Sequence, residues 1–311
     1  MTTHEVEHEI TVAAPAADVY RLLSGVEDLP RIFPPTVFVE QVERKGDEEQ
    51  IRVWATANGE AVSWTSRRVF DERALRIDFW QEATAAPIDS LRGSYVIEPL
   101  GEHRSRIRLL HTCRALDDDA EALEWIARAV DQNSRLQLAS LKDSLEQAHA
   151  GRDLTFSFED TVRVAGSVED VYDFVNDAHL WGDRLPHILT VRFVEDPVGL
   201  QTLETDTRLE DGSVHTTKAY RVCFPHRRIA YKAARTPALL ALHIGSWTFE
   251  EDGDGVLASA RHTVALDAAG ITEYLGPQAS VGDAKEYVRS ALSANSLATL
   301  RCAKEYAEAR R

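Results

Sequence analysis

Cysteine and long apolar runs are scarce in this chain of 311 residues, and basic residues are fewer than acidic ones. Its three cysteines, Cys113, Cys223 and Cys302, are widely separated, so they provide neither a disulfide framework nor a CxxC metal-binding pair. No run approaches the ~18 apolar residues of a membrane span. The N-terminal MTTHEVEHEITV lacks the basic and apolar regions of a secretory signal. We therefore expect a cytoplasmic protein.

The shortage of basic residues excludes two classes of partner. Lysine and arginine total 35 against 51 acidic residues, giving a formal net charge of -16 and a pI near 5.1. Nucleic acids and anionic membranes would have to bind against this field, so we expect neither. A hydrophobic content of 44% is typical of a globular protein, and the length is sufficient for two domains.

An internal repeat organises the chain. The segment ITVAAPAADVYRLL is echoed by VRVAGSVEDVYDFV, and Tyr20 and Tyr172 mark a separation of 152 residues. The same separation relates Gly93-Ser94-Tyr95 to Gly245-Ser246-Trp247. A period this long indicates duplicated domains rather than a solenoid. We therefore predict two domains, residues 1–150 and 151–311.

Each half contains the same order of elements. A strand and a short helix are followed by alternating segments that read as strands, and then by one long helix without proline or glycine, residues 120–148 in the first half. A curved antiparallel sheet needs an apolar partner on its concave side, and the long helix supplies it. The predicted fold is α+β, with two tandem helix-grip domains, each a curved sheet around a C-terminal helix and each enclosing a cavity.

Alternation suggests which side chains line the first cavity. It places Val62, Trp64, Ser66, Arg68 and Phe70 on the apolar face of one strand. A guanidinium on that face requires a wet pocket, a carboxylate or a ligand oxygen. An arginine that extends from the strand end into solvent would produce the same pattern.

The two long helices carry an asparagine at matching places. Asn133 and Asn295 fall at spacings of three or four from apolar residues, which predicts that both lie on the buried helix face. An amide lining the cavity and a structural amide bonded to the sheet both fit this spacing.

The strand Trp64-Thr65-Ser66-Arg67-Arg68, the Asn133-Ser134 pair and the doubled architecture resemble the di-domain aromatase/cyclases of bacterial type II polyketide synthases, in the START/Bet v1-like superfamily. The resemblance implies an enzyme that closes the first ring of a poly-β-ketone, between C7 and C12, and aromatises it by loss of water. No cofactor and no metal is implied. The implied partners are the polyketide intermediate, free or tethered to an acyl carrier protein, and other synthase subunits.

Residue roles follow from the resemblance and from side-chain chemistry. Arg68, Ser66 and Asn133 are the expected catalytic residues, with arginine holding a developing alkoxide. The expected substrate-binding residues in both halves are Trp64, Phe70, Trp80, Tyr95, His111, Trp181, Tyr220, Trp247, His262 and Asn295.

The second half departs from the motif. At the fixed separation of 152, Thr216, Lys218 and Tyr220 replace the tryptophan, serine and arginine. This leaves open whether the second domain is catalytic or supports its neighbour. The fold itself also serves carriers of hydrophobic ligands, so a non-catalytic lipid- or polyketide-binding protein is the alternative function.

Overall fold

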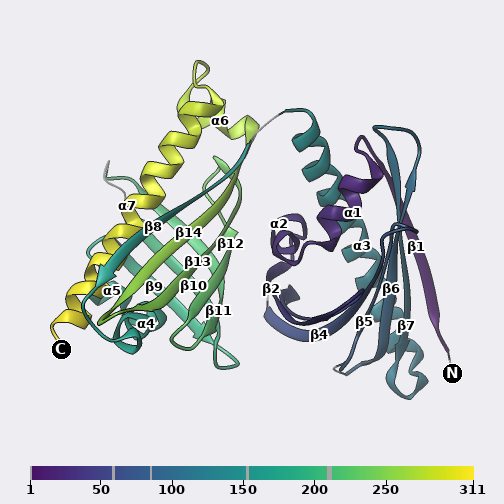
Figure 1. Cartoon of the computed structure of the whole chain (residues 1–311), viewed down its shortest axis with the longest axis horizontal. Helices are drawn as coiled ribbons and strands as arrows, with labels where there is room; N and C mark the ends of the chain where they lie inside the picture. Colours follow the sequence, from purple (N-terminus) through teal and green to yellow (C-terminus); the bar gives the residue numbers. More distant parts are fainter. Residues whose placement is uncertain (1, 58–59, 85, 152–153, 209–211) are drawn as a thin grey trace. The chain divides into compact units, whose positions relative to one another are not determined.

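The computed structural model describes residues 2–57, 60–84, 86–151, 154–208 and 212–311. The chain divides into two compact units, residues 1–153 and 154–311, and each contains a seven-stranded sheet of its own (Figure 1). Every strand pair in the described part of the chain joins strands of the same unit.

The first unit is an antiparallel sheet in the order β1-β7-β6-β5-β4-β3-β2. Its strands are β1 (His4–Val12), β2 (Thr36–Lys45), β3 (Glu48–Ala57), β4 (Glu60–Asp71), β5 (Arg76–Gln81), β6 (Ile88–Pro99) and β7 (Ser105–Ala115). Its helices are α1 (Ala16–Ser24), α2 (Leu29–Ile32) and α3 (Ala120–His149), with short 3-10 turns η1 (Val26–Asp28) and η2 (Leu116–Asp118).

The second unit repeats this plan, with the sheet order β8-β14-β13-β12-β11-β10-β9. Its strands are β8 (Thr155–Val164), β9 (Ile188–Glu195), β10 (Leu200–Arg208), β11 (Val214–Phe224), β12 (Arg228–Arg235), β13 (Leu240–Asp252) and β14 (Gly255–Leu266). Its helices are α4 (Val168–Asn176), η3 (Ala178–Leu180), α5 (Trp181–Arg184), α6 (Ala268–Leu275) and α7 (Val281–Glu308).

Local sequence determines where the long helices begin. The Asp119 carboxylate accepts the backbone N–H groups of Glu121 and Ala122 at the start of α3. Ser280 and Asp283 form a reciprocal capping box at the start of α7. The predicted α+β fold with two helix-grip units is confirmed. None of the described helices is long and apolar enough to cross a membrane.

One element has no counterpart in the first unit. Helix α6 lies between the last strand and the long helix of the second unit, where the first unit has only the turn η2. Asp267 caps α6 by accepting the N–H groups of Ala269 and Gly270. The sequence repeat shows extra residues at this place but does not identify them as a helix.

Candidate active site

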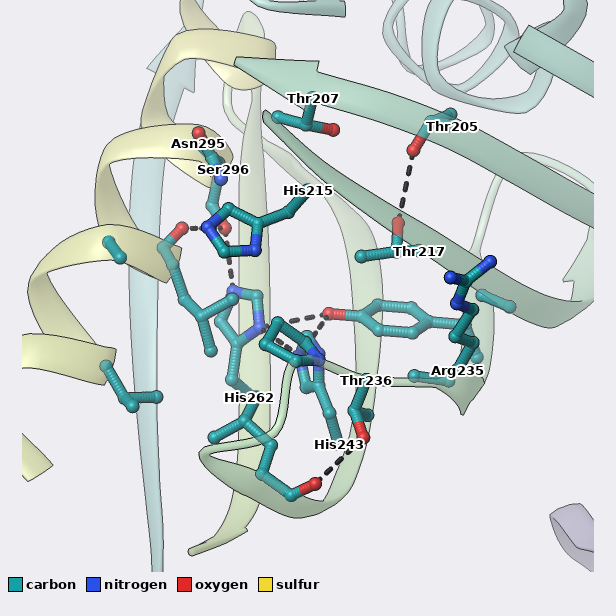
Figure 2. Close-up of a pocket in the computed structure, with 18 of the residues that line it drawn as sticks. Thr205, Thr207, His215, Thr217, Arg235, Thr236, His243, His262, Asn295 and Ser296 are labelled. Carbon is teal, nitrogen blue, oxygen red and sulfur yellow. Dashed lines mark hydrogen bonds between the residues drawn. The ribbon is translucent and has the colours of Figure 1, made fainter. Parts of the chain in front are cut away.

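The second unit holds a cavity of about 230 Å³ between the sheet and α7. Apolar and aromatic side chains form most of the wall, among them Trp181, Leu203, Trp247 and Leu292. Asn295 and Ser296 reach it from α7, while His243 and His262 reach it from β13 and β14 (Figure 2). A mostly apolar cavity with a few converging polar groups is the usual form of a small-molecule site.

Three polar side chains meet in the wall of this cavity. The Tyr231 hydroxyl lies 3.0 Å from His262 Nδ1 and 3.3 Å from His243 Nε2. The two imidazole nitrogens are themselves 3.0 Å apart. Because the three residues come from the adjacent strands β12, β13 and β14, the rigid sheet sets their spacing.

Ser296 fixes which nitrogen of His262 carries the proton. The single hydroxyl proton of Ser296 is donated to the backbone carbonyl of Leu292, at 2.9 Å. The 2.7 Å contact between His262 Nε2 and Ser296 Oγ therefore has Nε2–H as its donor. In the neutral ring, Nδ1 is then left with a lone pair directed at Tyr231 and His243.

Burial keeps both imidazoles uncharged. Desolvation lowers the pKa of His262 to about 4, and desolvation together with the neighbouring His262 lowers the pKa of His243 to about 3. Desolvation also raises the pKa of Tyr231 above its usual range, so the phenol keeps its proton. At neutral pH the cluster therefore contains a phenol and two neutral imidazoles.

A cation stands beside this cluster. Arg221 on β11 is the direct cross-strand partner of Tyr231 on β12, and both line the cavity. The Arg221 side chain is only 2% exposed, and its Nη2 donates to the carbonyl of Val175 at 2.7 Å. Its guanidinium also lies over the Trp181 ring, with Cζ 5.2 Å from the ring centre.

The arginine of the first unit has different surroundings. Arg68 is buried, and its Nε donates to Glu49 Oε1 at 2.6 Å. Its Nη1 and Nη2 each donate at 2.8 Å to the carbonyls of Leu23 and Ser24. All three nitrogens therefore have protein partners, and of the settings considered from the sequence it is the carboxylate that is present.

Most of the expected residues of the first unit do lie on the inner face. Trp64 Nε1 donates to Ser66 Oγ at 3.1 Å, and the Tyr95 hydroxyl donates to Gln137 at 3.0 Å. The Cζ atom of Arg68 lies 4.9 Å from the centre of the Phe70 ring. His111 contacts Phe79 edge-on, and burial lowers its pKa to about 4.

Two placements in the first unit are wrong. Asn133 is exposed, because the buried face of α3 runs through Val130, Ser134 and Leu138. Spacings of three or four residues fit either neighbour, and the helix presents Ser134. Trp80 lies on the outer face of β5, because the alternating residues Ile77 and Phe79 take the inner face.

One placement in the second unit is also wrong. Tyr220 is buried but lies on the opposite face of β11 from the cavity residues Thr217, Ala219 and Arg221. The counterpart of Arg68 is therefore Arg221. The other expected residues of this unit, Trp181, Trp247, His262 and Asn295, do line the cavity.

Sequence reasoning missed Tyr231, His243, Arg221 and Ser296 as site residues, although a glycine signals the first of them. A Cβ on Gly245 would lie 2.4 Å from the Tyr231 hydroxyl oxygen, so only glycine lets this ring cross β13. A Cβ on Gly93 would likewise lie 2.5 Å from the Phe79 ring. The repeated glycine thus marks an aromatic ring on the inner face of each sheet.

Comparisons with known proteins agree with this architecture. The family described as "Polyketide cyclase / dehydrase and lipid transport" matches residues 3–146 and again residues 155–305. The granaticin polyketide synthase bifunctional cyclase/dehydratase of Streptomyces virginiae is 50% identical, over 96% of this chain and 98% of the relative. The actinorhodin polyketide synthase bifunctional cyclase/dehydratase of Streptomyces coelicolor is 41% identical, over 96% and 95%.

A solved structure extends the likeness to three dimensions. The di-domain ARO/CYC BexL from the BE-7585A biosynthetic pathway superposes with a TM-score of 0.93 and 53% identity, over 99% of this chain and 100% of that one. With a family match in each unit and relatives that align over nearly their whole length, the chain belongs to the polyketide cyclase/dehydrase family as a di-domain member.

Proposed function

We propose that this chain closes and dehydrates a ring of a poly-β-ketone in the cavity of its second unit, with first-ring closure between C7 and C12 as the resemblance implies. The observation that carries the proposal is the meeting of Tyr231, His243 and His262 beside Arg221 in an apolar cavity. The full-length relatives named bifunctional cyclase/dehydratase support the reaction class.

Ring closure needs a base, an acid and a held cation. His262 Nδ1 accepts a proton from a carbon flanked by two carbonyl groups, and the resulting enolate attacks a distant carbonyl to form the new C–C bond. Arg221 stabilises the negative charge on oxygen. Tyr231 protonates the alkoxide and regains a proton from His262 across their 3.0 Å contact.

Dehydration reuses the same groups. The neutral His262 removes the second proton from the same carbon, the C–O bond breaks, and the hydroxyl group leaves as water with the proton of Tyr231. Proton return from His262 to Tyr231 restores the starting state. The cavity wall, which includes Trp181 and Trp247, limits how the chain folds and so which carbons can meet.

One further feature follows from the relatives. They are named as parts of granaticin and actinorhodin synthases, so we propose that this chain works with the other subunits of such a synthase. The carrier alternative explains the cavity but gives no purpose to a phenol and two imidazoles held within 3.3 Å of one another. The enzyme is therefore favoured.

Tyr231→Phe tests the proposal, because it removes one hydroxyl and copies Phe79 of the first unit. In a reconstituted synthase we expect loss of the aromatic product and accumulation of uncyclised or undehydrated shunt products, with an unchanged melting temperature. Tyr95→Phe is the matched control, since it removes a hydroxyl from the inner face of the first unit. Normal product from Tyr231→Phe would contradict the proposed site.

A further inference from the structure

The two arginines differ in their cross-strand neighbour. On the first sheet Arg68 pairs across the strands with Glu49, and on the second sheet Arg221 pairs with Gln201. Both neighbours are 1% exposed. The structural counterpart of a buried carboxylate is thus a buried amide, which has a similar shape and no charge.

Arg221 has fewer partners than Arg68: it lacks a carboxylate at Nε and has one backbone carbonyl where Arg68 has two. Among the described residues it has no ion pair, and its Nε and Nη1 nitrogens are buried without any hydrogen-bond acceptor. The carbonyl of Val175 and the face of Trp181 hold the group in place but do not neutralise it. A buried cation in this condition is costly unless an acceptor arrives.

Gln201 does not replace the missing carboxylate, and its side-chain Oε1 is buried without a hydrogen bond. Its amide nitrogen lies 3.3 Å from the carbonyl and 3.2 Å from the side-chain oxygen of Asn176. It also lies 3.4 Å from Glu195 Oε1, which accepts the N–H of Gly199 at 2.8 Å. The carboxylate of Glu195 therefore bonds the amide and the loop, and it acts on Arg221 only through its charge, which raises the pKa of the guanidinium against the larger lowering by burial.

We propose that Gln201 determines the charge of the second cavity: by leaving Arg221 without a carboxylate in contact it makes this cavity a site for an anionic oxygen, whereas Glu49 closes the matching position of the first unit to such a ligand. The inference rests on the proposed function and deepens it. In the reaction the anionic oxygen is that of the deprotonated 1,3-dicarbonyl group. Gln201 acts through Arg221 and is a positioning residue.

A binding experiment tests this without turnover. Isothermal titration calorimetry at neutral pH compares 3-hydroxy-2-naphthoate, a flat anion, with the uncharged 3-hydroxy-2-naphthamide. We expect the full chain to prefer the anion by about tenfold to a hundredfold, the range of one charge-assisted hydrogen bond. Gln201→Glu restores the Glu–Arg pair of the first unit and should abolish the preference while leaving amide affinity unchanged.

Three variants complete the test. Gln201→Met keeps the size without charge and should retain the preference for the anion. Arg221→Gln should lose it, which keeps the test valid if Gln201→Glu folds poorly. Glu49→Gln, the reverse exchange in the first unit, should add a second, weaker anion site.

The outcomes are distinguishable from those of the proposed function. Equal affinity of the unaltered chain for anion and amide, or an undiminished preference in Gln201→Glu, would overturn the inference. Tyr231→Phe removes no charge, so it should bind the anion normally while failing to make product. Normal product from Tyr231→Phe, with anion preference intact, would overturn only the proposed catalytic site.

Discussion

His262 Nε2 lies 2.7 Å from Ser296 Oγ, and this contact places the ring proton on Nε2. Nδ1 therefore keeps a lone pair that faces Tyr231. The first unit has the same pair of residue types, but His111 Nδ1 lies 3.4 Å from Ser134 Oγ. There the neighbouring aromatic residue is Phe79, which has no hydroxyl to complete a relay. The second unit therefore has a phenol–imidazole cluster at the place where the first unit has a phenylalanine beside its histidine.

Ser296→Ala should remove the hydrogen bond that keeps the proton of His262 on Nε2. Without the acceptor, His262 can carry its proton on either nitrogen, so we expect kcat to fall by about tenfold to a hundredfold while KM changes little. The loss of a partner for a buried donor should also cost about 1–3 kcal/mol of stability. Ser296→Thr should rescue kcat, and Ser134→Ala should leave it unchanged; a parallel loss in both alanine variants would contradict the assignment.

Acid should destabilise the protein through its buried histidines. Folding lowers the pKa of His111 and His262 to about 4 and of His243 to about 3, so the unfolded chain binds these protons more readily. Their contribution to the unfolding free energy is complete above pH ~6.5 and falls as the pH drops below it, by up to ~1.4 kcal/mol per unit and histidine.

The variant His243→Leu isolates this effect, because Leu91 occupies the matching place in the first unit. Denaturant unfolding at several pH values between 7 and 5 should show a shallower loss of stability in the variant than in the parent. Paired carboxylates also contribute to acid sensitivity, but they are common to both proteins. Identical slopes would show that His243 is charged or exposed in solution.

Gly245→Ala should damage the site by displacing Tyr231. The added carbon would meet the hydroxyl of Tyr231 at 2.4 Å and the backbone oxygen of Arg261 at 2.5 Å. Gly93→Ala meets the Phe79 ring and the backbone oxygen of Leu110 at similar distances. We expect both to lower the melting temperature and only Gly245→Ala to abolish product; intact product from folded Gly245→Ala would contradict the placement of Tyr231.

Glu49→Ala should lower the free energy of unfolding more than Gln201→Ala, the matching change in the second unit. It leaves the buried guanidinium of Arg68 without its carboxylate, at a cost of about 3–5 kcal/mol. Gln201→Ala removes no charge from beside Arg221, so its cost should be clearly smaller. Unfolding of both variants in urea measures the difference in their free energies of unfolding. Equal costs would show that the Glu49–Arg68 pair contributes no net stability.

The doubled architecture and the order of elements in each unit can be read from the sequence. Period, strand alternation and turn residues are local properties, and duplication shows each of them twice. It also shows that Gly93 and Gly245 repeat, but only the structure shows the rings of Phe79 and Tyr231 that approach them. The inner placement of Trp64, Ser66 and Arg68 follows from alternation alone.

Which arginine reaches the cavity of the second unit depends on how the strands pair. Gln201 on β10 pairs with Arg221 on β11, and Glu49 on β3 pairs with Arg68 on β4. The chain between the paired residues is one residue longer in the second unit than in the first. A shift of one residue turns each side chain to the other face of a strand, so Arg221 enters the cavity and Tyr220 leaves it. The rotation of α3 that exposes Asn133 and buries Ser134 is likewise fixed by packing against the sheet. Sequence spacing cannot resolve neighbours that differ by one residue, because the partners that distinguish them lie on other strands.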